Sequence, residues 1–303
     1  MKTGVILATL GGPRRPEEIP EFIKHFTGRE LPAPVMKAIV ERYRVIGGFS
    51  PLTHITEDQA KRLNEVLGDE YLCLPAFRYC RPSIEDVIES MRAAGGERIL
   101  FLLLSPFYTS VTTGNYINLA RAYIEKTSLS LPVSFLHSWH KEPLFIGSWA
   151  EKIRSESFDG QACYLYSAHS LPMKFSHEPY RRQIEETVAL VAAHAGTRNH
   201  ALGWQSIPGN VPEPWITPTV EEKIDEIASR GFRNLIQVPI GFTADHIETL
   251  YDIDITHRRY ALEKGLSFRR ISSLNADESF IKALKEIVTK PPVMPAPIYS
   301  KNV

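Results

Sequence analysis

Four short segments of the chain concentrate the glycine, hydroxyl, imidazole and carboxylate groups that bind ligands or carry out acid–base chemistry. They are Leu10–Pro13 (LGGP), Ser105–Asn115 (SPFYTSVTTGN), Ser167–Pro172 (SAHSLP) and Gly241–Asp254 (GFTADHIETLYDID). Each directly follows a predicted strand, and in open parallel sheets ligands bind beyond the carboxyl ends of the strands. The four segments are therefore expected to lie on one side of their sheets.

His169 is the first candidate for metal or proton chemistry, because it follows an apolar strand and has small neighbours on both sides. The dipeptide Leu171-Pro172 stiffens the chain just beyond it. Partial loss of water at such a position favours the neutral imidazole, which can bind a metal or accept a proton. The alternative is a hydrogen-bonded histidine with a purely structural role.

The last segment opens a predicted helix, Ala244–Tyr260, that is rich in acidic residues. Acidic residues in a first helical turn complement the helix dipole, and this alternative suits Asp245. Glu248 and Asp252 are spaced i, i+4 and share a face, where like charges destabilise a helix by roughly 0.2–0.5 kcal/mol unless a cation lies there. We therefore expect a row of carboxylates for a divalent cation. His246 and Asp254 lie in the same stretch.

The composition limits the class of protein. The 303 residues include 35 basic and 35 acidic side chains, so no charge signature for nucleic acid is present. Three cysteines (Cys73, Cys80 and Cys163) without a CxxC pair favour a reducing compartment, and we expect a cytoplasmic location. No apolar stretch approaches the roughly 20 residues that span a bilayer, so no transmembrane segment is expected. LGGP lacks the GxGxxG spacing, and no organic cofactor is expected.

Short β-branched runs alternate with helical patterns, which predicts an α/β fold with parallel sheets flanked by helices. We expect two doubly wound lobes, residues 1–139 and residues 140–303, with a cleft between them. The second lobe would include a last helix, Ser279–Thr289, and a Pro-rich tail after Lys290. Strands are predicted at Val5–Leu10, Tyr71–Pro75, Arg98–Leu104, Val133–His137, Ala162–Ser167, Ala201–Gln205 and Asn234–Pro239.

Several motifs together resemble the ferrochelatase family from about Val5 to Lys290. They are LGGP (10–13), IGGFSPL (46–52), SAHSLP (167–172), GWQS (203–206) with PEPW (212–215), and VPIGFTADHIETLYDID (238–254). The resemblance implies two Rossmann-like, chelatase-like lobes with a porphyrin in the cleft. It also implies a lyase of heme biosynthesis that inserts Fe2+ into a porphyrin, with the iron as substrate.

The resemblance implies site residues as well. His169 and Glu248 are expected to be catalytic and to face each other across the macrocycle; which of them takes the pyrrole protons is left open. His169, Glu248 and Asp252 are the expected metal-binding residues, and Thr256 stands where relatives often carry a third acidic residue. Porphyrin contacts are expected from Leu10, Gly11, Arg29, Tyr43, Ser50, Arg78, Ser110 and Thr113.

The identity of the porphyrin stays open between two types. The short segment after LGGP resembles the bacterial coproporphyrin type, and we favour coproporphyrin III. Leu10, where many of that type carry Tyr, and Arg78-Tyr79 instead resemble the protoporphyrin IX type. The alternatives are a chelatase for sirohydrochlorin or cobalt, which tends to use histidine pairs, and a non-catalytic tetrapyrrole carrier. Expected partners are the porphyrin, ferrous iron and, transiently, other heme-pathway enzymes.

Overall fold

The computed structural model describes residues 2–156, 162–209 and 212–290, which form two compact units. One unit comprises the described residues of Met1–Trp139 and Ala276–Val303, and the other is His140–Asn275. The predicted second lobe, residues 140–303, is therefore wrong at its end. Its last helix belongs to the first unit, because Phe280 packs near Trp139 and the helix contacts the helix Leu52–Leu67 of that unit. The predicted Pro-rich tail after Lys290 lies outside the described residues.

The first unit is built on a four-stranded parallel sheet of order β2-β1-β3-β4. Its strands are β1 (Thr3–Thr9), β2 (Tyr71–Phe77), β3 (Arg98–Leu103) and β4 (Val133–Leu136). Val5, Ile6 and Leu7 of the central strand β1 are fully buried. Such a continuous apolar run is typical of a parallel strand covered on both faces.

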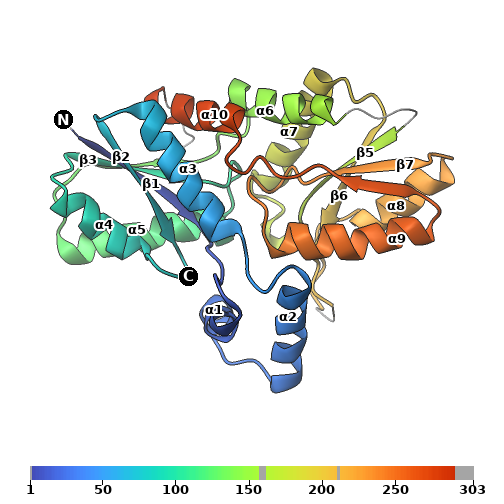
Figure 1. Ribbon diagram of the computed structural model, residues 1–303, viewed down its shortest axis with the longest axis horizontal. Helices are drawn as coiled ribbons and strands as arrows, with labels where there is room; N and C mark the ends of the chain where they lie inside the picture. Colours follow the sequence, from blue (N-terminus) through green and yellow to red (C-terminus); the bar gives the residue numbers. More distant parts are fainter. Residues whose placement is uncertain (1, 157–161, 210–211, 291–303) are drawn as a thin grey trace. The chain divides into compact units, whose positions relative to one another are not determined.

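Helices cover both faces of this sheet (Figure 1). Ile84, Val87, Ile88 and Met91 of α4 pack with Ile6 and Phe101 on one face, and α5 joins the same cluster. The helices of the unit are α1 (Ile19–Thr27), α2 (Ala33–Val45), α3 (Leu52–Leu67), α4 (Ile84–Ala93), α5 (Asn115–Thr127) and α10 (Glu278–Thr289), with a 3-10 turn η1 (Pro16–Glu18) and a π-helix η2 (Ser110–Gly114).

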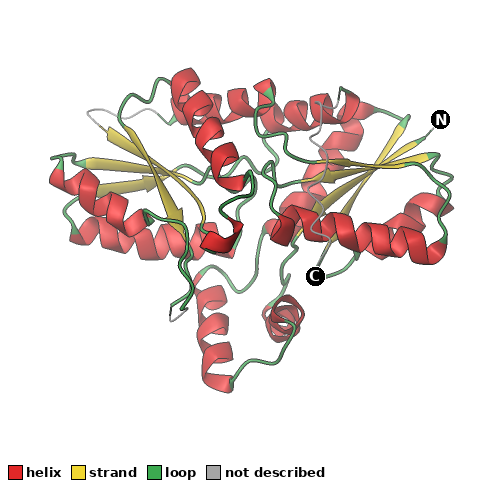
Figure 2. Cartoon of the chain, turned by 180° about the vertical axis from the view of Figure 1, so that it is seen from behind, coloured by secondary structure: helices red, strands yellow, loops and turns green. Residues whose placement is uncertain are grey.

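The second unit is again a sheet flanked by helices (Figure 2). Its four strands are parallel and have the order β6-β5-β7-β8. Its strands are β5 (Ala162–His169), β6 (His200–Gln205), β7 (Asn234–Val238) and β8 (Ser267–Arg270). Its helices are α6 (Pro143–Ser155), α7 (Tyr180–Ala195), α8 (Val220–Ser229) and α9 (Arg258–Glu263), with a 3-10 turn η3 (Met173–Phe175) and a π-helix η4 (Glu248–His257). The central strand β5 therefore lies between β6 and β7.

Local sequence explains how a helix such as α8 begins and packs. Thr219 accepts a hydrogen bond from the Glu222 backbone and Glu222 accepts one from the Thr219 backbone, which makes a capping box. Val220, Ile224 and Ile227 recur at helical spacing and are fully buried against the sheet. The spacing of apolar residues thus fixes which face of the helix is inside.

The predicted α/β fold with two parallel, helix-flanked sheets is confirmed. Strand β8 was not predicted, because the sequence SFRR carries one apolar residue and forms a short edge strand. Helix α1 was not predicted either. Among the described residues, no helix is both long and apolar enough to cross a bilayer.

Candidate active site

The segments that follow β5 and β7 meet at the carboxyl end of the second unit's sheet. Tyr166 of β5 pairs with Val238 of β7, so both strands end at the same edge. The Gly241 backbone N–H donates to the Ser167 carbonyl at 3.1 Å. A Cβ at position 241 would lie 2.8 Å from Ala168 Cα and Cβ, so only glycine lets the chain after β7 approach β5 this closely.

This close approach brings His169 and Glu248 together. His169 is the last residue of β5 and Glu248 the first of η4, and His169 Nε2 lies 3.8 Å from Glu248 Oε1. The two side chains are 32% and 29% exposed, so both can be reached from solvent. The convergence that was predicted from the strand ends is thus found for the two segments of this unit, those after β5 and β7.

The surroundings of His169 select the nitrogen that can react. His169 Nδ1 lies 2.5 Å from the Ser170 carbonyl oxygen, which can only accept a hydrogen bond, so Nδ1 carries the proton. In the neutral ring Nε2 then offers a lone pair on the side of Glu248. Tyr180 Oη donates to the His169 carbonyl at 2.9 Å and holds the end of the strand. The imidazole is thus oriented to bind a cation or accept a proton through Nε2.

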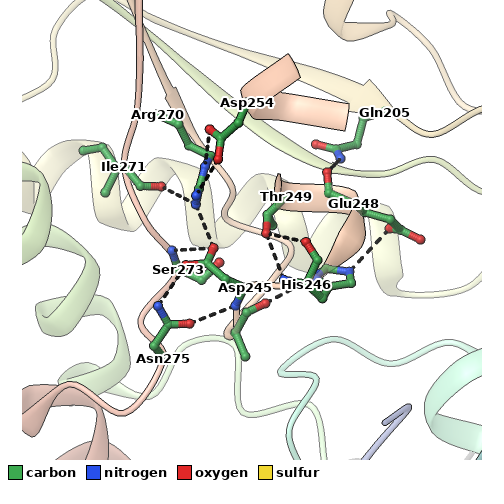
Figure 3. A network of polar contacts seen from close by, with 11 residues as sticks. Gln205, Asp245, His246, Glu248, Thr249, Asp254, Arg270, Ile271, Ser273 and Asn275 are labelled. Carbon is green, nitrogen blue, oxygen red and sulfur yellow. Dashed lines mark hydrogen bonds and ion pairs between the residues drawn. The ribbon is translucent and has the colours of Figure 1, made fainter. Parts of the chain in front are cut away.

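His246 is a third member of the cluster that the sequence analysis gave no role. Its Nε2 lies 3.7 Å from Glu248 Oε2 (Figure 3). Its Nδ1 lies 3.2 Å from the Ala244 carbonyl oxygen, and its ring centre is 4.8 Å from that of Phe242. The Glu248 carboxylate therefore lies between two imidazoles. The signal for His246 was its place two residues before Glu248.

Electrostatics keep Glu248 charged. Burial by itself would raise the pKa of Glu248, but the charge of His169 in its protonated state and the hydrogen bond and charge of His246 outweigh burial and lower the pKa to about 2. The site thus holds an anionic carboxylate at any pH near neutrality. An anionic carboxylate of this kind can attract a cation.

Asp252 lies on the same π-helix but is held by a different neighbour. Ser206 Oγ donates to Asp252 Oδ2 at 2.8 Å, and Gln205 Nε2 lies 3.4 Å from the Glu248 carbonyl. Within residues 2–156, 162–209 and 212–290, no three His, Cys, Asp or Glu side chains gather closely enough to hold a metal ion. The structure does not draw His169, Glu248 and Asp252 into one ligand set, and the row of carboxylates stays a prediction.

The predicted helix Ala244–Tyr260 is wrong at its start and in its type. The regular π-helix begins at Glu248 and α9 follows it. Asp245 lies in the preceding loop, where its backbone N–H donates to Asn275 Oδ1 at 2.8 Å and its carboxylate pairs with Arg270 at 2.7 Å. Asp245 therefore does not complement a first helical turn, because a tertiary ion pair takes its carboxylate.

The expectation that His169 and Glu248 face each other across a macrocycle is also wrong. A separation of 3.8 Å leaves no room for a ring between the two groups. The physical reason is topological: β5 and β7 are adjacent parallel strands, so the segments after them lie at the same edge of one sheet. The two groups form an adjacent pair.

Several predicted porphyrin contacts lie at the carboxyl ends of the first unit's strands. Leu10 and Gly11 follow β1, and Gly11 has φ +79° and lies against Phe77. Ser50 packs on Gly12 so closely that a Cβ at Gly12 would lie 2.6 Å from the Ser50 Cβ. The topology thus places these residues near one another.

Others follow β2 and β3 in the same unit. The Arg78 guanidinium lies over the rings of Tyr79 and Tyr116, at 5.0 and 5.7 Å. Ser110 begins η2, and the buried Thr113 Oγ1 donates to the Phe107 carbonyl at 2.8 Å. The porphyrin contacts of these residues stay predictions.

Tyr43 and Arg29 belong to the segment of α1 and α2 and do not directly follow a strand. Tyr43 is buried in α2 with 2% of its surface exposed. Arg29 is exposed in the segment between α1 and α2. Their roles also stay predictions.

Two α/β units, each built on a parallel sheet and with polar groups at its strand ends, define a protein of the chelatase fold. SirB from Bacillus subtilis with Fe3+ matches with a TM-score of 0.62 and 11% identity, over 97% of this chain and 96% of that chain. SirB from Bacillus subtilis subspecies spizizenii in complex with cobalt matches with a TM-score of 0.57 and 12% identity, over 96% and 95%. At this identity the likeness shows the fold alone.

Comparison with known sequences shows which family of the chelatase fold the chain resembles. The ferrochelatase family pattern matches residues 2–291. The coproporphyrin III ferrochelatase of Geobacillus sp. (strain WCH70) is 35% identical, and that of Halalkalibacterium halodurans is 36% identical, each over 95% of this chain and 97% of the relative. The chain belongs to the ferrochelatase family. The predictions of this family and of an enzyme that inserts a metal into a porphyrin are confirmed.

Proposed function

We propose that this chain is a cytoplasmic lyase that inserts ferrous iron into coproporphyrin III. The observation that carries the assignment of the site is the pair of His169 Nε2 and Glu248 Oε1 at 3.8 Å. The choice of porphyrin is supported by relatives of 35–36% identity that are coproporphyrin III ferrochelatases. The location is supported by the free cysteines Cys73, Cys80 and Cys163. Transient contacts with other heme-pathway enzymes stay a prediction.

The reaction exchanges two pyrrole N–H protons for one Fe2+ ion. Glu248 is the weaker base of the pair: when His169 is protonated, its charge together with His246 lowers the pKa of Glu248 to about 2 against burial, so a proton on the pair stays on the imidazole. We therefore assign proton acceptance to His169: the pyrrole N–H bond breaks and a proton binds Nε2. The Glu248 carboxylate stabilises the resulting imidazolium. His169 must release the first proton before it takes the second, and its 32% exposure allows exchange with water.

Iron would approach along the carboxylates of η4. Fe2+ binds carboxylate oxygens, and Glu248 and Asp252 lie one turn apart on this helix. A site with few protein ligands suits a substrate metal, because an ion held by a complete cage would not pass to the porphyrin. Asp252→Asn should therefore raise the KM for Fe2+ by about tenfold and change the porphyrin KM by less than about twofold.

The test is anaerobic metallation followed by visible absorbance, with Fe2+ and either coproporphyrin III or protoporphyrin IX. Coproporphyrin III has four carboxylates and protoporphyrin IX two, so charge-assisted hydrogen bonds favour the former, and we expect at least about a tenfold higher kcat/KM. Faster turnover of protoporphyrin IX would overturn the substrate. Binding of either porphyrin without metallation would overturn the enzyme assignment in favour of a carrier.

A parallel assay with sirohydrochlorin and Co2+ tests the alternative that the chain is a chelatase for another tetrapyrrole or metal. The observation that favours this alternative is the pair of histidines around Glu248, since such chelatases tend to use histidine pairs. His246 Nε2 lies 3.7 Å from Glu248 Oε2. We expect turnover at least about a hundredfold below that with coproporphyrin III and Fe2+. Comparable rates would transfer the assignment to the other tetrapyrrole.

A further inference from the structure

Arg270, the last residue of the edge strand β8, lies at the centre of a partly buried ionic network (Figure 3). Its side chain is 10% exposed. Nε and Nη2 donate to Asp254 Oδ1 and Oδ2 at 2.8 and 2.9 Å, and Nη1 donates to Asp245 Oδ1 at 2.7 Å. One guanidinium of β8 thus holds two carboxylates of the segment that carries Glu248.

The two carboxylates bracket Glu248 in the sequence. Asp245 lies in the loop just before η4, whereas Asp254 lies within η4. Arg270 therefore fixes the entry of this helix and its middle to β8. The Glu248 side chain has other partners, the imidazoles of His169 and His246.

Asp245 extends the network to the segment after β8. Asn275 Nδ2 donates to Asp245 Oδ2 at 2.9 Å, Asn275 Oδ1 accepts from the Asp245 backbone N–H at 2.8 Å, and the Ser273 backbone N–H donates to Asp245 Oδ1 at 3.3 Å. The loop that delivers His246 and Glu248 is thus fastened through its backbone and one side chain.

Two physical arguments indicate that the network serves position. Burying an arginine with carboxylates costs desolvation that the ion pairs offset only in part, so such a network contributes little net stability. A π-helix is rare, occurs mostly as a single turn and is often found at functional sites. The ten residues of η4 therefore need tertiary support to keep Glu248 in place.

We propose that Arg270 is a positioning residue for metal insertion: by holding Asp245 and Asp254, it keeps Glu248 beside His169. This inference rests on the proposed role of the His169–Glu248 pair. A displacement of the pair by about 1 Å is expected to lower the rate up to a hundredfold. Porphyrin binding should change little, because Arg270 acts on the pair and not on the porphyrin.

The experiment compares Arg270→Gln, Arg270→Lys and the matched control Arg269→Gln in the anaerobic metallation assay. Arg269 is the neighbouring residue of β8, but its side chain is 51% exposed and pairs with Glu156 at 3.4 Å. We expect Arg270→Gln to lower kcat by about 10- to 100-fold with the porphyrin KM within about twofold. Arg270→Lys should recover part of kcat, since it keeps the charge and loses the fork. Arg269→Gln should match the wild type.

Circular dichroism, thermal unfolding and the Glu248→Gln background distinguish a loss of positioning from a general loss of folding. If Arg270 acts through Glu248, Arg270→Gln should lower the residual kcat of Glu248→Gln by less than about twofold. An equal loss in both backgrounds, or a folded Arg270→Gln with wild-type kcat, would overturn the inference. Where the residual kcat is too low to measure, the kcat–KM split and the Arg270→Lys recovery decide. Failure of the proposed function is distinct, since the wild type itself would then not metallate porphyrin.

Discussion

His169 Nε2 and Glu248 Oε1 lie 3.8 Å apart, and the two residues reach this distance from neighbouring strands of one parallel sheet. His169 ends β5, and Glu248 follows the loop that leaves β7. An imidazole and a carboxylate at this distance interact electrostatically. The carboxylate stabilises a proton on the imidazole, and the protonated imidazole stabilises the charged carboxylate. The pair therefore lies within a single unit of the protein.

Replacing His169 with Ala removes the Nε2 lone pair that faces Glu248. We expect the metallation rate to fall by at least about a hundredfold, because general bases contribute about 10²–10⁴-fold. The fold should survive, since the side chain is about one-third exposed. Anaerobic turnover and circular dichroism check both points. The matched control is His194→Ala at the exposed end of α7, and unchanged turnover in His169→Ala would contradict the assignment.

Glu248→Gln keeps the shape of the side chain and removes its charge. The opposing influences of burial and the histidine charges leave the pKa of Glu248 at about 2, so the wild-type carboxylate is ionised at all pH values well above 2. We expect at least about a tenfold lower kcat/KM, and a variant-to-wild-type ratio that does not rise toward one as the pH falls from 9 to 6. Glu263→Gln, an exposed change on α9, is the control. A ratio near one at pH 6 would mean that the carboxylate is already neutral there.

Gly241→Ala tests the close approach between the chain after β7 and β5. The added methyl would lie 2.8 Å from Ala168 Cα and Cβ, so one of the two segments must move. We expect a loss of about 1–3 kcal/mol in unfolding free energy and a lower kcat, because the move displaces the His169–Glu248 pair. Urea unfolding and turnover measure the two effects. Gly147→Ala on α6, where a methyl meets nothing within 4 Å, should cause neither.

Burial of His257 makes the stability of the second unit depend on pH. It is 3% exposed at the end of η4, with Nδ1 at 3.1 Å from Gln237 Nε2, and burial lowers its pKa from 6.5 to about 4. As the pH falls, the unfolded chain binds the proton first, so the stability present above pH 6.5 is lost between about pH 6.5 and 4.

His257→Asn should therefore reduce the loss of unfolding free energy between pH 7 and pH 5 by on the order of 1–2 kcal/mol. Urea unfolding at the two pH values measures this difference for the wild type and the variant. His194→Asn at the exposed end of α7 should leave the difference as in the wild type. An identical pH dependence in His257→Asn and the wild type would show that this histidine is not buried in its neutral form.

The alternation of apolar runs with helical patterns was enough to predict the parallel α/β fold. The place of SAHSLP and GFTADHIET after two such runs was enough to bring His169 and Glu248 to a strand-end site, because parallel strands direct their carboxyl ends to one edge. The motifs identified the family. Edge strand β8 could not be predicted from SFRR, because pairing with β7 and not burial makes it a strand.

The sequence by itself determined the residue types of the site and the sheet edge at which they meet. Only the tertiary structure decided that His169 and Glu248 are neighbours, that His246 joins them, and that η4 is a π-helix starting at Glu248. The reason is that these features depend on contacts between residues far apart in the chain. Gly241 packs on Ala168 and Arg270 binds Asp245, and no local pattern encodes either contact.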